Sequence, residues 1–181
     1  MVSTFGAEDE GMTNTSDRER ADILDLLHKH RELLLHTVDG VTDEQAAART
    51  TVSELCLGGI IKHVTAVEER WAGFVIDGPS VFPPMDEAAY KAHLASFQMQ
   101  PHETLAGIVA AYGEVARRTD ELVSTVASLD ADHELPPAPW FEPGARWSAR
   151  RSFTHIVAET AQHAGHADII REAIDGQKSM G

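Results

Sequence analysis

Four side chains able to bind a metal ion or transfer a proton lie in one stretch near the C-terminal end of the chain. His155, Glu159, His163 and His166 follow one another at spacings of four, four and three residues. At about 100° per residue of helix, they fall within a band of about 80° on one face. Apolar residues share or flank that band: Ile156, Val157, Ala167, Ile170 and Ile174. Because a polar group inside an apolar core must be satisfied, this face predicts either internal hydrogen bonds or a metal site.

A metal site built on this helix needs a ligand from a second element. Glu159 and His163 are one helical turn apart, so both can reach one ion. His63 is the best third ligand, because it lies in a helical apolar stripe between Ile60 and Val67. Two histidines and one glutamate leave a coordination position open for water or a thiolate. A metal ion lowers the pKa of either group and makes it a nucleophile near neutral pH.

The same residues also have an interpretation without a metal. A single histidine on an apolar face is usually a hydrogen-bonded core residue, and a glutamate four residues before a histidine also stabilises a helix. His155 and His166 are predicted to support the ligands by hydrogen bonds or to line a pocket. Histidines outside the pattern are expected at the surface: His28, His36, His93, His102 and His133.

The elements that position these residues are predicted to be helices. Long helices are expected from residue 16 to 39, from 53 (capped by Ser53) to 77, from 101 to 129 and from 147 to 176, with short ones at 42–49 and 86–97. No segment has a strand pattern, and residues 133–147 are rich in proline and aromatic residues. The predicted fold is an all-α four-helix bundle over residues 16–181, with a long connection between the second and third long helices and a disordered lead-in at 1–15.

Composition limits the classes of partner. The chain has 181 residues and a formal net charge of −14, which argues against binding nucleic acid or an anionic membrane. Cys56 is the only cysteine, so an internal disulfide is excluded and the thiol is expected to act as a small core hydrophobe. Without a leader or a long apolar run, a cytoplasmic location is expected.

Two segments resemble the DinB/YfiT-like superfamily of metalloenzymes, in the branch long described as a domain of unknown function. They are THIVAETAQHAGHADIIREAIDG at 154–176 and SELCLGGIIKHVTAVEERW at 53–71. The resemblance implies a four-helix bundle holding one divalent ion through His63, Glu159 and His163. Most of the superfamily uses three histidines, whereas the related mycothiol-dependent maleylpyruvate isomerases use two histidines and a glutamate.

The resemblance also implies an activity and a metal. Characterised relatives bind the sulfur of a low-molecular-weight thiol at the ion, so a mycothiol-dependent thiol S-transferase or isomerase acting on an electrophile is expected. Zinc suits these ligands best, while nickel, iron and manganese also accept them. The alternatives are a catalytically silent metal-binding or stress-response protein, and a structural domain whose core histidines bond each other. A homodimer is expected only by analogy with similar bundles.

Residues close to the start of the last helix are candidates for the pocket wall. Trp147 and Trp140 are predicted to be core aromatics or to line the pocket mouth. Arg146, Arg150 and Arg151 are candidates to bind an anionic part of the thiol or of the substrate. Of the three, Arg150 is the one predicted to belong to the pocket. The alternative is a solvated basic turn at the helix N-terminus, where positive charge is mildly unfavourable, and the ligand role stays open beside it.

Overall fold

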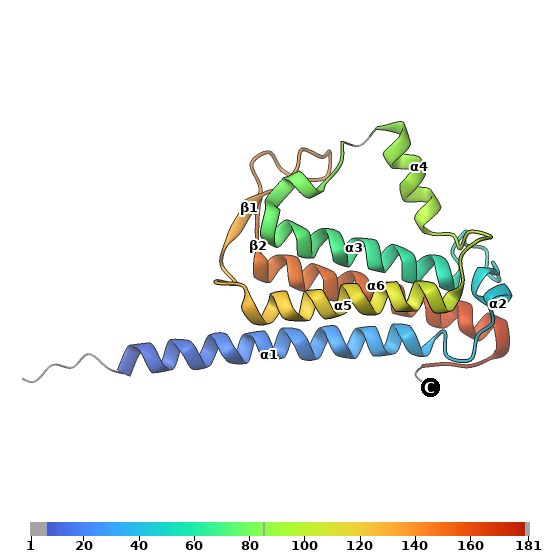
Figure 1. Cartoon of the computed structure of the whole chain (residues 1–181), viewed down its shortest axis with the longest axis horizontal. Coiled ribbons are helices and arrows are strands. Elements are labelled where there is room, and N and C mark those ends of the chain that lie inside the picture. Colours follow the sequence, from blue (N-terminus) through green and yellow to red (C-terminus); the bar gives the residue numbers. More distant parts are fainter. Residues whose placement is uncertain (1–6, 85, 180–181) are drawn as a thin grey trace, which may run out of the picture.

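Four long helices run side by side and form the body of the molecule (Figure 1). A computed structural model of the chain describes residues 7–84 and 86–179, with side chains from residue 15 onward. The long helices are α1 (Ala7–His36), α3 (Leu57–Asp77), α5 (Leu105–Thr125) and α6 (Ala149–Asp175). Helix α6 packs against α1 and α3, and α5 packs mainly against α3. The predicted all-α fold is confirmed.

Short elements connect the long helices. They are α2 (Asp43–Ala47), the 3-10 turn η1 (Gly78–Val81), α4 (Glu87–Ser96), β1 (Asp132–Glu134) and β2 (Arg146–Ser148). Helix α4 stands away from the bundle on the path from α3 to α5 (Figure 1). Strands β1 and β2 pair antiparallel, with His133 opposite Trp147. No strand was expected from the sequence, because strands of three residues are too short to show an alternating pattern.

The last helix begins and ends close to the predicted limits. The Ser148 hydroxyl accepts a hydrogen bond from the Arg151 backbone N–H and caps the N-terminus of α6. Gly176 ends the helix in the left-handed conformation, with φ of +82°.

Two other helix starts differ from the expected ones. Helix α3 begins at Leu57 after Cys56, not after Ser53, because residues 51–54 form bends whose hydroxyl groups bond the local backbone. Helix α1 begins at Ala7 instead of residue 16. Residues 1–6 of the predicted lead-in at 1–15 lie outside the described residues. Disorder in the lead-in stays a prediction.

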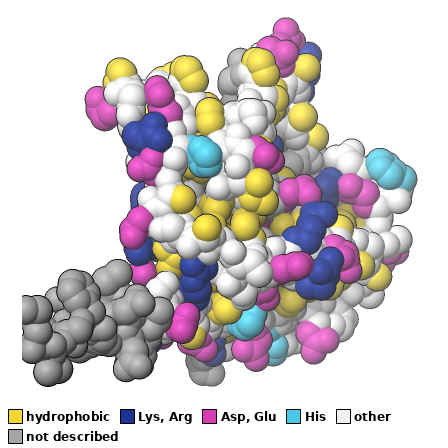
Figure 2. Space-filling model, turned by 60° about the vertical axis from the view of Figure 1, so that its left-hand side comes forward, with side chains coloured by type: hydrophobic (Ala, Val, Ile, Leu, Met, Phe, Trp, Pro, Cys, Tyr) yellow, Lys and Arg dark blue, Asp and Glu magenta, His cyan; other side chains and the backbone are white. Residues whose placement is uncertain are grey.

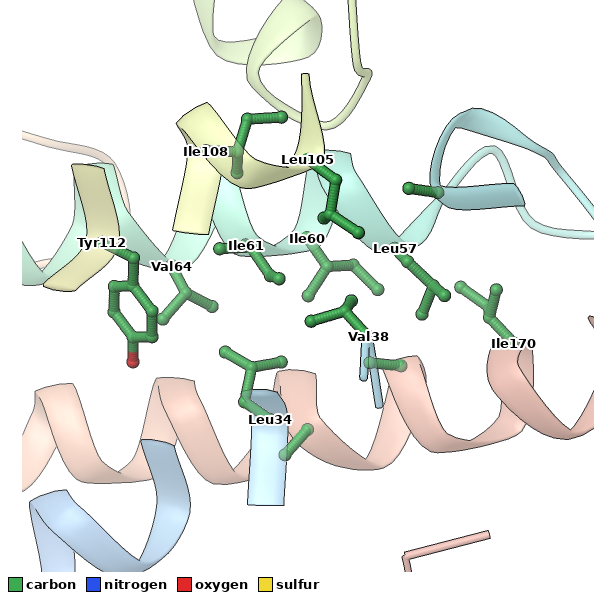
Figure 3. Packing of buried hydrophobic residues seen from close by; sticks show 13 residues of the cluster. Leu34, Val38, Leu57, Ile60, Ile61, Val64, Leu105, Ile108, Tyr112 and Ile170 are labelled. Carbon is green, nitrogen blue, oxygen red and sulfur yellow. The ribbon is translucent and has the colours of Figure 1, made fainter. Parts of the chain in front are cut away.

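Buried apolar side chains form two clusters along the bundle. The first surrounds Leu34, Ile60 and Tyr112, and it is drawn in Figure 3 between α1, α3, α5 and α6. The second surrounds Leu27, Phe74 and Phe153 at the end of the bundle that carries the two strands. Each cluster draws on all the long helices, so their relative positions are fixed at both ends.

A buried ion pair joins three of these helices. Glu68 of α3 is completely buried, and Arg31 of α1 is 5% exposed. The Arg31 Nη2 atom lies 2.5 Å from Oε1 of Glu68, and its Nη1 atom lies 2.6 Å from Oδ1 of Asp120 on α5. Arg31 therefore bridges two carboxylates inside the bundle.

The outer surface mixes both signs of charge. Figure 2 shows basic and acidic side chains interspersed on one face, with hydrophobic side chains gathered between them. Most basic side chains of the described residues contact an acidic partner, as Lys62 does with Glu103 at 2.7 Å. Among the described helices, none combines the length and the apolar character that crossing a membrane requires.

Candidate metal centre

His63, Glu159 and His163 converge between α3 and α6. One possible ligand atom from each residue lies within 4.8 Å of the other two. His63 and His163 are buried, and the Glu159 side chain is 27% exposed. The carboxylate therefore gives the group its access to solvent, as the open position of a catalytic metal site requires.

The antiparallel course of α3 and α6 brings these residues together. The His63 and His163 rings lie 4.8 Å apart, whereas Trp71, two turns further along α3, lies 4.9 Å from His155. As α3 moves toward its C-terminus it therefore meets residues nearer the N-terminus of α6. In this register His63 lies opposite the turn that contains Glu159 and His163.

Burial sets the charge of the three groups. It lowers the pKa of His63 to about 4, with further contributions from His163, His93 and Arg70. It also lowers the pKa of His163, to which His166 adds, and it raises the pKa of the Glu159 carboxyl. Both imidazoles are therefore neutral near pH 7 and offer a lone pair to a metal ion without first losing a proton.

His166 and His155 lie next to His163 and Glu159, on opposite sides along α6. The Nδ1 atom of His166 lies 3.5 Å from Nδ1 of His163, while Nε2 of His163 faces Glu159 Oε2 at 3.8 Å. The other carboxylate oxygen, Oε1, lies 3.7 Å from Nε2 of His155. In both His163 and Glu159, one side-chain atom faces the other of these two residues, and a second atom faces a neighbouring histidine.

The segment after α4 covers His63. The Phe97 ring stacks on the His63 ring at 4.0 Å, and His93 approaches the same ring edge-on at 5.7 Å. His93 is exposed as predicted, but its contact with the site was not anticipated. Phe97 carries no periodic signal that relates it to α3, so the sequence alone did not identify it.

The backbone at Phe97 and Gln98 lies in close contact with α3. A Cβ atom added to Gly59 would lie 1.9 Å from the Phe97 carbonyl oxygen, so a glycine is required there. The Cys56 thiol donates to the same carbonyl at 3.8 Å, and the Lys62 ammonium donates to the Gln98 carbonyl at 2.9 Å. These contacts fix the position of Phe97 over the histidine.

Aromatic rings form a wall beside Glu159. Trp71 and Trp147 stack at 4.5 Å, and both rings contact the His155 ring at about 5 Å. Trp147 therefore belongs to this wall, and its role in a substrate pocket stays a prediction. Trp140 is 68% exposed and contacts Phe141 at 6.1 Å, outside this wall.

The three arginines near the start of α6 have different surroundings. Arg150 forms ion pairs with Glu19 and Asp130, and these hydrogen bonds raise the pKa of its guanidinium. Arg146 pairs with Asp132 across the two strands. Arg151 lies over the Trp147 ring, with its Cζ atom 4.4 Å from the ring centroid. A ligand role for Arg150 stays a prediction.

Comparison with known families gives a match over most of the chain. A family model described as mycothiol S-transferase matches residues 22–176, a range that includes all the long helices from the middle of α1 onward. The chain belongs to the mycothiol S-transferase family. This membership agrees with the DinB/YfiT-like resemblance of the two segments. A search of curated proteins gives no match.

The donor set of this mycothiol S-transferase family member fits a divalent ion. Two neutral imidazoles and one carboxylate are ligands that zinc accepts, and Glu159 and His163 each have a neighbouring histidine on α6. The Nδ1 atom of His163 contacts His166, which leaves Nε2 of His163 facing Glu159. This orientation distinguishes the arrangement from three unrelated polar groups. The site therefore fits a metal ion on its own geometry.

Proposed function

We propose that the protein is a metal-dependent S-transferase that uses mycothiol or a similar low-molecular-weight thiol. A single divalent ion, preferably zinc, binds His63, Glu159 and His163. The convergence of these three ligands within 4.8 Å, in a chain of the mycothiol S-transferase family, supports the proposal. The partners are a small thiol and a small electrophile, and the proposed location is the cytoplasm.

The side chains of the site have distinct roles in this reaction. A divalent ion bound there supplies Lewis acidity, which lowers the pKa of a thiol near it. His166 holds Nδ1 of His163, and His155 holds the outer oxygen of Glu159, so both ligands keep their orientation. Phe97 and Trp71 exclude water from the two ends of the site.

The transfer itself exchanges one bond for another. The thiol sulfur forms a bond to an electrophilic carbon of the second substrate. The leaving group departs with its bonding electrons, and the thiol proton passes to solvent. The wall formed by Trp71, Trp147 and His155 lies beside Glu159 and is the surface on which the electrophile binds.

Metal analysis of the purified protein tests the metal centre. We expect about one divalent ion per chain, and His63→Ala should lose it because two ligands on one helix bind an ion much more weakly than three. His102→Ala is the matched control, since His102 is exposed and lies outside the site. Absence of metal from the wild-type protein after reconstitution would support a structural role for the histidines and contradict the proposal.

A transferase assay tests the activity. The loaded protein should accelerate the reaction of mycothiol with a generic alkylating electrophile, and His63→Ala should not exceed the uncatalysed rate. His102→Ala should retain the wild-type rate. Bound metal without any acceleration would favour the catalytically silent metal-binding protein.

A further inference from the structure

Two arginines beside the candidate metal centre have no acidic partner in the part of the chain that the structure describes. They are Arg70 on α3 and Arg151 in the first turn of α6, and both are exposed. Their neighbours differ in this respect, because Glu69 pairs with Arg118 and Arg150 pairs with Glu19 and Asp130. The chain has a net charge of −14, so an acidic partner for these two cations would not have been scarce.

Arg151 is held in a position suited to binding an anion. Its guanidinium lies over the Trp147 ring at 4.4 Å, a cation–π distance. The guanidinium has no hydrogen bond to an acidic side chain among the described residues, and a guanidinium can donate two parallel hydrogen bonds to a carboxylate. Helix stability does not explain this residue, because a cation in the first helical turn opposes the helix dipole.

The position of Arg151 relative to the centre follows from α6. Arg151, His155 and Glu159 succeed one another at four-residue spacing, so they follow one stripe of the helix. The distance along the axis from Glu159 to Arg151 is about 12 Å. The His155 ring lies between them, with the rings of Trp71 and Trp147 about 5 Å from it. The His155 side chain is 23% exposed, so an aromatic ring bearing an anionic group can lie over it and span this stripe.

Arg70 approaches the same end of the site from α3. It follows His63 by seven residues, which places it two turns further along nearly the same side of the helix. Since Trp71 contacts both His155 and Trp147, this turn of α3 lies beside the N-terminal part of α6. Arg70 and Arg151 therefore border the aromatic wall from two helices.

We propose that Arg151 and Arg70 bind a carboxylate on an aromatic electrophile whose ring lies against Trp147 and His155. The inference rests on the proposed function for the reaction, but the binding step does not require turnover. It names the second substrate class as aromatic compounds with an anionic group at one end and a reactive carbon at the other. The reactive carbon then lies toward Glu159.

A matched pair of compounds tests the reaction with this class. The pair is 4-(chloromethyl)benzoate and its neutral methyl ester, each with mycothiol. In both reactions the thiol sulfur bonds to the benzylic carbon, the C–Cl bond breaks, chloride departs with the electron pair and the thiol proton passes to solvent. We expect kcat/KM to favour the acid over the ester by about tenfold, as a charged hydrogen-bonded contact provides.

An equilibrium measurement separates the two proposals. Binding of 4-methylbenzoate and of its methyl ester, which have no leaving group, is measured by ligand-observed NMR titration. Arg151→Met should raise the Kd of the acid about tenfold and leave that of the ester unchanged. Arg151→Lys should recover part of the affinity. Arg117→Met is the control, because Arg117 is exposed on α5 and pairs only with Glu114 and Glu121.

The outcomes are distinct. Binding that favours the acid over the ester, and that loses this preference in Arg151→Met, supports the anion site. If turnover is also absent, the anion site is still supported and the transfer reaction is contradicted. Equal affinity for the acid in wild-type protein and Arg151→Met would overturn the inference. A change in KM for mycothiol, with no change for the acid, would also overturn it, because it would place the anion on the thiol.

Discussion

His163 shows how one residue depends on its immediate neighbours in this site. Its Nε2 atom faces Glu159 at 3.8 Å, and its Nδ1 atom faces His166 at 3.5 Å. A proton on Nδ1 leaves the lone pair on Nε2, which is the tautomer that a ligand in this orientation requires. His166 therefore influences metal affinity by fixing the ring and its tautomer.

The substitution His166→Ala should weaken metal binding without abolishing it. Loss of a residue that orients a ligand typically reduces affinity by about 10- to 100-fold. Competition with a chelating dye measures this affinity. His166→Asn, which keeps a hydrogen-bonding group, should recover part of it, whereas His102→Ala should match the wild-type protein. Unchanged affinity in His166→Ala would contradict the orienting role.

Glu159 and His163 could be proposed as ligands from the sequence, because helical spacing determines which residues of α6 share a face. His63 was also predictable, since it interrupts an apolar stripe. The surroundings of Arg150 were not, because its partners Glu19 and Asp130 are distant in sequence and only the packing of α1 brings Glu19 near. The contact of Phe97 with His63 depends on a connection that has no repeating pattern.

At the scale of elements, the segment that follows α4 is fixed by a close backbone approach. Gly59 allows the Phe97 carbonyl to lie against α3, and Lys62 binds the next carbonyl of the segment. The short hairpin before α6 was not predicted, because its strands of three residues are too short to show an alternating pattern.

Gly59→Ala should disturb the candidate metal centre, although Gly59 is not one of the proposed ligands. The new methyl group would require the Phe97 backbone to move, since a separation of 1.9 Å is impossible. We expect loss of about 1–3 kcal/mol of unfolding free energy and a weaker metal affinity. Urea unfolding and dye competition measure the two effects. Gly113→Ala is the control, because nothing lies within 4 Å of its added Cβ and alanine favours the helix. Equal behaviour of the two variants would contradict the close approach.

At the scale of the whole molecule, a buried ion pair connects three of the long helices. Arg31 and Glu68 join α1 to α3, and Asp120 adds α5. Such a pair does not have to add stability, because removing two charges from water is costly. It does require the helices to meet in one register, since any shift would leave a buried charge without a partner. The overall bundle was predictable from apolar periodicity, but this pairing between helices was not.

Glu68→Ala should be among the most destabilising single substitutions. It leaves the buried Arg31 without its main partner, and we expect a loss of about 3–5 kcal/mol in urea unfolding. Glu69→Ala should cost less than about 1 kcal/mol, because Glu69 forms only an exposed ion pair with Arg118. The double variant Arg31→Met/Glu68→Leu should recover much of the lost stability. If the double variant is no more stable than Glu68→Ala, the ion pair contributes more to stability than the neutralisation of one buried charge by the other.

The burial of Cys56 has a consequence for a protein proposed to handle reactive electrophiles. Cys56 is 2% exposed and is enclosed between the start of α3 and the Phe97 carbonyl. It is the only thiol in the chain. An alkylating compound that enters the site therefore meets the sulfur of the thiol substrate and not one belonging to the protein. The same packing that holds Phe97 over His63 makes the protein resistant to modification by its own substrates.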